Sequence, residues 1–312
     1  MLRLFCLIAL FFVTSAQAEV RVLTSIKPLQ LIAAAVQDGI GEPEVLLSPG
    51  ASPHHYALRP SDVRRVRDAD LLYWIGPDME AFLPRVLESR DKPQVAVQDL
   101  PGMTLRRFGD SHDEHDHDHD AHEHEHTSAD LGHDHDHRPG SLDAHLWLLP
   151  ANARVIAARM AADLSKLDAA NAQRYAANLQ AFGQRLDVLD GRIRPQLVAL
   201  HGKPYFVFHE AFDYFEAAYG LKHAGVFSVL TEVQPGAQHV AAMRERLQQA
   251  GPSCLFSEPP LRPRLAETLT AGLPVKLAEL DALGGNLPVD ASGYERLLEN
   301  LANGLTECLG SL

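Results

Sequence analysis

Ten of the seventeen histidines of this 312-residue chain lie in residues 110–137, together with eleven aspartates and glutamates and no lysine or arginine. Imidazole is a common ligand of divalent transition metals, and at neutral pH most histidines are deprotonated and free to bind. A purification tag is the alternative interpretation, but tags stand at chain ends and lack the interleaved acids. The pattern predicts auxiliary metal binding by His112, His115, His117, His119, His122, His124, His126, His133, His135 and His137.

The same segment is not expected to fold alone. Leu131 is its only sizeable apolar side chain, and repulsion between its carboxylates opposes compaction. We therefore expect a mobile, hydrated loop at 110–138, inserted into a better ordered domain.

Three histidines outside this segment stand near the ends of predicted strands or at turns: His54, His145 and His209. Three neutral imidazoles with an open or carboxylate-occupied fourth position describe a tetrahedral site suited to zinc. Asp281 directly follows another predicted strand. The three histidines are far apart in sequence, and an isolated histidine is more often solvated or hydrogen-bonded than a ligand, so position alone leaves both interpretations open.

No motif predicts catalysis, because the chain has no P-loop, no HExxH and no GxSxG sequence. One alternative is a zinc hydrolase or lyase that uses three histidines and an activated water, with Asp281 or Glu210 as its base. Another is a plain metal buffer in which the histidine-rich segment is the functional part. We expect no enzyme.

The beginning of the chain predicts export. Arg3 precedes the apolar run 4–13, and Ala16-Gln17-Ala18 fits a signal-peptidase site, so residues 1–18 are expected to be a signal peptide cleaved after Ala18. No later stretch approaches the roughly 20 apolar residues of a membrane-spanning helix.

Two cysteines, Cys254 and Cys308, remain after the leader is removed. In an oxidising compartment they are expected to form a disulfide that holds the last helix to its domain. A two-cysteine zinc site is the competing interpretation, but neither cysteine has another cysteine or a histidine at ligand spacing.

The formal net charge of −13 is concentrated in the histidine-rich segment, which contributes −11. The rest of the mature chain is nearly neutral. This balance argues against nucleic acid as a partner and offers no strongly basic surface for lipids.

Strands and helices alternate along the remaining chain, which predicts α/β domains with parallel sheets. In the first half we expect strands at 20–26, 44–47, 71–75, 95–97 and 144–148, and helices at 29–37, from 61 or 62 onward, 80–88 and 152–166. In the second half we expect strands at 205–208, 226–229, 254–257 and 275–280, and helices at 211–219, 238–250, 262–271 and 294–309.

Between these halves, apolar residues recur every three or four positions from Tyr175 to Ile193, which predicts one long helix at 167–200. Such a helix would run about 45 Å, although Gly183, Gly191 and Pro195 interrupt its pattern. The prediction is an N-terminal (β/α) domain at 19–166, a linking helix at 167–200 and a C-terminal (β/α) domain at 201–312. Ligands of such folds bind outside the carboxyl ends of strands, here in the cleft between the domains.

Several sequence blocks resemble the zinc-specific solute-binding proteins of bacterial ABC transporters. In chain order these are GASPHHYALRPSDVRRVRDADLLYWIGPDMEAFLP, DAHLWLLP, DAANAQRYAANLQAFGQRL, FVFHEAFDYFEAAYGL, VQPGAQ and FSEPP. The resemblance covers nearly the whole mature chain. It implies two (β/α) domains joined by a rigid helix, a periplasmic and monomeric protein, Zn²⁺ as cargo, and a membrane permease with its cytoplasmic ATPase as partners.

The resemblance also implies a ligand set, since the family's three metal-binding histidines fall on His54, His145 and His209. Asp281 matches an aspartate that supplies an oxygen ligand in manganese-binding relatives, where a carboxylate usually replaces the third histidine. A manganese-binding protein is therefore an alternative, but imidazole at this position favours zinc. Asp281 either contacts the metal or leaves the fourth place to water.

Other polar residues near these motifs have weaker predictions. His55 departs from the family pattern and competes with His54, which the family position favours. His201 and His239 are expected to be solvated, and His223 is considered for a weak auxiliary site with the histidine-rich loop. Glu258 has either a structural role or that of orienting a ligand.

Overall fold

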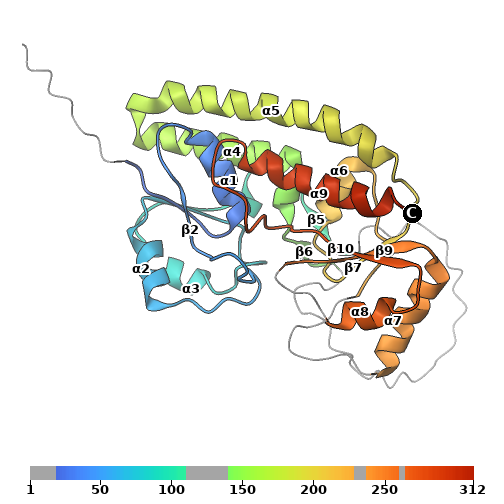
Figure 1. Cartoon of the computed structure of the whole chain (residues 1–312). Helices are drawn as coiled ribbons and strands as arrows, with labels where there is room; N and C mark the ends of the chain where they lie inside the picture. Colours follow the sequence, from blue (N-terminus) through green and yellow to red (C-terminus); the bar gives the residue numbers. More distant parts are fainter. Residues whose placement is uncertain (1–18, 110–139, 228–236, 260–263) are drawn as a thin grey trace, which may run out of the picture.

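The computed structural model describes residues 19–109, 140–227, 237–259 and 264–312. The predicted signal peptide, the histidine-rich segment and the end of the strand expected at 226–229 lie outside the described residues. The described chain contains two separate parallel sheets, one in each half, beneath a layer of long helices (Figure 1).

The first sheet has the strand order β2-β1-β3-β4, and all its neighbouring strands are parallel. Its central strands consist of apolar and β-branched residues that are buried throughout, as expected for a sheet covered on both faces. The strands are β1 (Val22–Thr24), β2 (Glu44–Val45), β3 (Leu71–Trp74) and β4 (Gln94–Ala96), and the helices among them are α1 (Lys27–Val36), α2 (Pro60–Asp68), α3 (Pro84–Leu87) and the 3-10 helix η1 (Val97–Asp99).

The second sheet has the order β10-β9-β7-β8 and is also parallel. A small separate core, which includes Phe206, Phe227 and Leu247, joins this sheet to helices α7 and α8. The elements are β7 (Tyr205–Val207), α6 (Asp213–Tyr219), β8 (Gly225–Val226), α7 (Ala237–Ala250), β9 (Ser253–Ser257), α8 (Arg264–Thr270), β10 (Val275–Glu279) and α9 (Gly293–Leu309).

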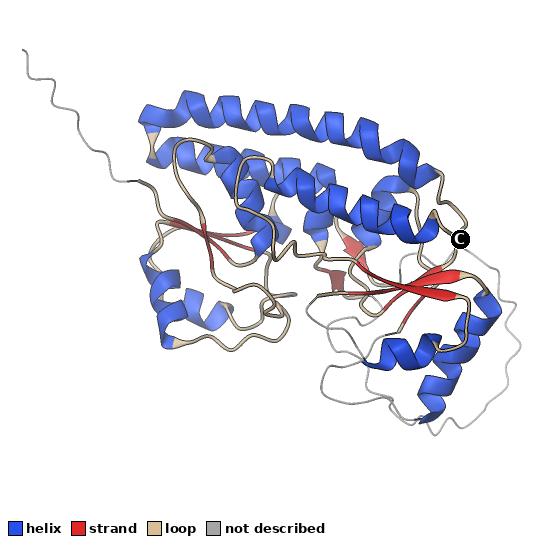
Figure 2. Cartoon of the chain, in the orientation of Figure 1, coloured by secondary structure: helices blue, strands red, loops and turns tan. Residues whose placement is uncertain are grey.

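One long helix, α5 (Ala172–Val198), extends over both halves (Figure 2), which confirms the linking helix. Its buried residues follow the helical period, and Gly183, Gly191 and Pro195 all lie inside it. It packs beside α1, α9 and α4 (Pro150–Leu167), and the 3-10 helix η4 (Ala169–Asn171) leads into it. The main hydrophobic core includes buried residues of both halves, so the two sheets rest against one helical layer.

The structure corrects two elements of the first half. The helix expected at 80–88 begins only at Pro84, because the chain before it turns back and the buried Glu80 carboxylate accepts the Gly76 N–H at 3.1 Å. The strand expected at 144–148 is wrong. Strand β6 (Leu142–Asp143) instead pairs antiparallel with β5 (Arg106–Arg107) and is followed by the 3-10 helix η3 (Leu146–Leu148).

Hydrogen bonds near η3 connect the two halves. The Trp147 indole donates to the Ala282 carbonyl at 2.9 Å, and the Tyr294 hydroxyl donates to the Trp147 carbonyl at 2.5 Å. Arg185 of α5 forms an ion pair with Glu295 of α9. The domain boundaries remain a prediction, but these contacts favour small relative movements over a wide hinge.

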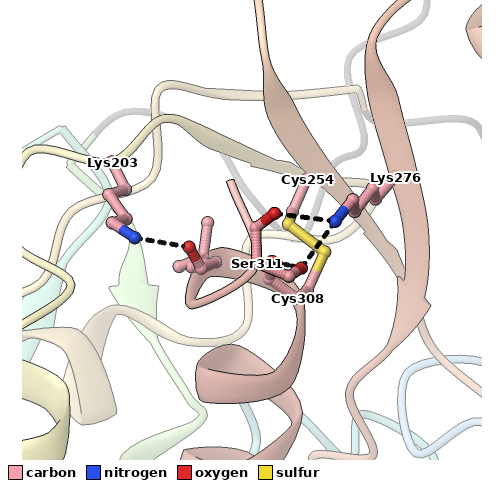
Figure 3. Close-up of a disulfide and its surroundings, with 6 residues drawn as sticks. Lys203, Cys254, Lys276, Cys308 and Ser311 are labelled. Carbon is pink, nitrogen blue, oxygen red and sulfur yellow. Dashed lines mark hydrogen bonds between the residues drawn. A yellow bond between two sulfur atoms is a disulfide. The ribbon is translucent and has the colours of Figure 1, made fainter.

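The expected disulfide between Cys254 of β9 and Cys308 of α9 is present, with the Cα atoms 6.2 Å apart (Figure 3). Lys203 donates to the Leu309 carbonyl at 2.7 Å, and Lys276 donates to the Ser311 carbonyl at 2.9 Å. The end of α9 is thus attached to the second sheet by one covalent and several polar contacts. None of the helices among the described residues has the length and apolar composition needed to cross a bilayer.

Candidate metal centre

The structure brings His54, His145 and His209 together from three separate connections. His54 lies in the loop between β2 and α2, His145 lies two residues beyond the end of β6, and His209 lies two residues beyond the end of β7. The carboxyl ends of β2 and β7 thus each lead to one of these histidines, as expected for ligand sites of parallel α/β folds. One ligand nitrogen from each of the three lies within 4.8 Å of the others.

The spacing of the nitrogens suits a tetrahedral metal ion. The Nε2 atoms of His54 and His145 are 3.3 Å apart. Two nitrogens bound to zinc at about 2.0–2.1 Å and separated by a tetrahedral angle would lie about 3.3–3.4 Å apart. The His209 ring centroid is 4.8 Å from that of His145 and 5.4 Å from that of His54. The geometry therefore fits a zinc-sized ion bound between the three rings.

Carboxylates fix two of the three imidazoles. Nδ1 of His145 is 2.7 Å from an oxygen of Asp143, and Nδ1 of His209 is 2.8 Å from an oxygen of Glu258. A carboxylate at Nδ1 holds the proton there and leaves Nε2 as the metal-binding atom, an arrangement that accompanies most histidine ligands. Glu258 thus occupies the orienting position considered for it from sequence.

Exposure differs between the two pairs. The side chains of His145 and Asp143 are 2% and 1% exposed, whereas those of His209 and Glu258 are 31% and 22% exposed. Burial raises the pKa of Asp143, while the backbone N–H of His145 lowers it. The group therefore has one buried histidine in the first half, His145, and one partly exposed histidine in the second, His209.

Asp281 does not belong to the group of closely spaced ligand atoms. Its Oδ1 accepts the backbone N–H groups of Leu283 and Gly284 at 3.0 and 2.8 Å, and its Oδ2 accepts that of Gly285 at 2.9 Å. The carboxylate thereby organises the loop whose Ala282 carbonyl bonds Trp147. Whether Asp281 also contacts a metal stays a prediction.

The other predicted histidines lie away from this centre. His55 is exposed, and its ring centroid is 6.4 Å from that of His54. His239 is exposed, in agreement with its predicted solvation, whereas His201 is exposed but its Nε2 atom lies 3.0 Å from the Tyr219 carbonyl oxygen. His223 is mostly buried and hydrogen-bonded to Glu216, and Glu210, the base considered for a hydrolase, lies with Asp213 and His223 in a second group. The ten histidines of residues 112–137 lie outside the described residues.

Sequence reasoning missed Asp143 and the second group. The only sequence signal for Asp143 is its place two residues before His145, from which its carboxylate reaches both the His145 backbone N–H, at 3.0 Å, and the ring. This turn also explains why the strand ends at Asp143.

Similarity to known proteins extends over nearly the whole chain. The family model described as "Zinc-uptake complex component A periplasmic" matches residues 22–308. The chain is 41% identical over 294 residues to the high-affinity zinc uptake system protein ZnuA of Yersinia pestis, covering 94% of this chain and 92% of that protein. It is 39% identical to the ZnuA protein of Haemophilus ducreyi, covering 94% of each.

Solved structures share the fold at lower sequence identity. A crystal structure of ZnuA has a TM-score of 0.71 at 20% identity, covering 92% of this chain and 100% of that one. The periplasmic zinc-binding protein TroA of Treponema pallidum also has a TM-score of 0.71 at 20% identity, with coverage of 94% and 99%. Together with the family match, these similarities show that the chain belongs to the ZnuA family of periplasmic zinc-uptake components.

Proposed function

We propose that this protein captures a zinc ion in the periplasm and delivers it to the membrane permease of an ABC transporter, which a cytoplasmic ATPase drives. The convergence of His54, His145 and His209 from three connections is the observation that supports this function. The cargo is bound and released without bond-making chemistry, and the family is one of uptake components. The protein itself needs no base, nucleophile or substrate pocket for this task.

The donor set supports zinc as the cargo. Three imidazoles match borderline zinc better than manganese, which prefers oxygen ligands. The same fold accommodates other metals, since one solved neighbour is described as the Pseudomonas aeruginosa protein FpvC in complex with Mn²⁺. The metal preference of this chain is therefore assigned to its ligands and not to the fold.

Water is the proposed fourth ligand. Both Asp281 oxygens already accept backbone N–H groups, and moving the carboxylate onto a metal would leave Leu283, Gly284 and Gly285 without these bonds. Losing hydrogen bonds to a charged group costs about 1.5–3 kcal/mol each. A water ligand avoids this cost.

Release is proposed to begin at the second half of the site, where His209 and Glu258 are partly exposed. His145 is held in place by burial and by its bond to Asp143, so a permease need displace only the accessible ligand. Protons compete with zinc for imidazole nitrogens, so affinity falls as pH decreases.

Deleting residues 113–137 tests whether the three-histidine centre is the functional one. The described residues on either side of the segment are hydrogen-bonded to each other, so a short connection can replace it. The Gly140 N–H donates to the Phe108 carbonyl at 2.8 Å, and the Phe108 N–H donates to the Ser141 carbonyl at 3.0 Å. The deletion is expected to remove several weak zinc equivalents and to leave one tight equivalent, measured by competition titration of chelator-stripped protein. A variant that keeps residues 113–137 but carries asparagine at their nine histidines is the control. Loss of the tight equivalent in both proteins would assign function to the segment as a metal buffer.

Replacing Asp143 or Glu258 by its amide tests their positioning roles. We expect Asp143→Asn and Glu258→Gln each to weaken zinc binding by about 10–100-fold, the usual effect of losing the carboxylate partner of a histidine ligand. Asp143→Asn should have the larger effect because its pair is buried. The ¹⁵N chemical shifts of the two imidazoles report the tautomer directly. An unchanged tautomer and unchanged affinity in both variants would contradict the assignment.

A further inference from the structure

A second group of metal-binding side chains lies beside the three-histidine centre. Glu210, Asp213 and His223 each place a ligand atom within 4.8 Å of the others, and none of them is exposed. Glu210 follows His209 directly, while Asp213 begins helix α6 and His223 follows that helix. The two groups therefore share the connection between β7 and α6, but no ligand.

The turn after α6 brings His223 back to the helix. Gly220 has a φ of +71°, a conformation that glycine adopts readily, and Leu221 then donates to the Glu216 carbonyl at 3.0 Å. Nδ1 of His223 lies 3.0 Å from both oxygens of Glu216, which in turn accepts the Tyr205 hydroxyl at 2.6 Å. His223 is thus held in a defined position.

One carboxylate oxygen of this group lacks a hydrogen bond. The Oδ1 atom of Asp213 is buried without a hydrogen-bond partner among the described residues, and the nearest His223 nitrogen is 3.8 Å away. The Asp213 side chain is only 12% exposed. Burial and the charge of Glu216 raise the pKa of Asp213. The positive charges of His223, Arg106 and Lys222 offset part of this repulsion at Asp213.

We propose that Glu210, Asp213 and His223 form a second site for a divalent transition-metal cation. Two carboxylate oxygens and one imidazole nitrogen are a harder donor set than three imidazoles, so this site accepts Mn²⁺ as well as Zn²⁺ and discriminates between them less. A bound cation gives the Oδ1 atom of Asp213 the partner that no hydrogen bond supplies among the described residues. The site does not depend on the function proposed for His54, His145 and His209.

Anomalous diffraction locates the ion directly. Crystals of the full chain are soaked in MnCl₂ alone or ZnCl₂ alone, and data are collected above and below each metal absorption edge. Both metals are expected to give a peak at Glu210, Asp213 and His223. A zinc peak at the three-histidine centre without a peak at the second group would overturn this inference and leave the proposed function intact. A peak at Glu210, Asp213 and His223 without a zinc peak at the three-histidine centre would contradict the proposed function and leave this inference intact.

A charge-matched pair of variants tests the same site in solution. Glu210→Gln/Asp213→Asn removes two ligands, and Asp38→Asn/Glu42→Gln removes two exposed carboxylates in the other half of the chain. The first variant is expected to bind one equivalent of Mn²⁺ fewer than the second, and both retain the histidine-rich segment. Equal stoichiometry in the two variants would count against the site.

The thermal stability of the metal-free proteins gives a second readout. The Tm of Glu210→Gln/Asp213→Asn should equal or exceed that of the control, because repulsion between the two carboxylates is relieved. A lower Tm would instead indicate that these carboxylates only balance the charges of Arg106 and Lys222.

Discussion

Replacing His145 by alanine is expected to weaken tight zinc binding on the order of 100-fold. Structural zinc sites bind with about 10–16 kcal/mol, so each of four ligands contributes about 3 kcal/mol on average, and each 1.4 kcal/mol is a factor of ten. His145 is the most buried of the three histidines, and its Nε2 atom lies 3.3 Å from that of His54. Among the described residues, the group of closely spaced ligand atoms contains no fourth side chain.

The matched control for this change is His239→Ala. His239 is exposed on α7, outside both groups of ligand atoms, so its loss should leave zinc affinity unchanged. Both variants are measured by competition titration in the protein that lacks residues 113–137, so that the histidine-rich segment does not mask the result. Equal affinities in the two variants would refute the assignment of His145 as a ligand.

Removing the disulfide with Cys254→Ser/Cys308→Ser is expected to lower the free energy of unfolding by about 4 kcal/mol, from the loop-closure entropy of a loop of this length. The sequence separation of the two cysteines is 54. For a chain of this size such a loss corresponds to a decrease in Tm of about 7 °C. The disulfide holds α9 to β9, and α9 packs against α1 and α5 of the shared helical layer.

Thermal unfolding of the metal-free protein measures this effect, with reduced wild-type protein as the control that should match the double variant. Zinc affinity at 25 °C should change little, because neither cysteine belongs to the ligand group or to its carboxylate partners. A loss of zinc binding equal to the loss of stability would show that α9 positions the centre directly.

Local patterns predicted most of the fold. The alternating strands and helices, the long helix and the disulfide each depend on residues close together in sequence or on two cysteines left to pair, and all three are confirmed. The prediction of a strand at 144–148 was wrong because apolar residues alone do not distinguish a strand from a buried 3-10 helix. The turn between β6 and η3 depends on the Asp143 side chain, which accepts the His145 backbone N–H.

The sequence identified the candidate histidines, but it did not predict from their positions that they lie close together in space. His54, His145 and His209 are separated by dozens of residues, and no periodicity extends across such distances. Only the packing of two sheets against one helical layer brings them together, gives His145 and His209 their carboxylate partners, and binds Asp281 to its own loop. The same packing gathers Glu210, Asp213 and His223. The residue types in the sequence set which side chains are candidates for metal binding. Long-range packing, which no local pattern encodes, sets which of these candidates lie close together.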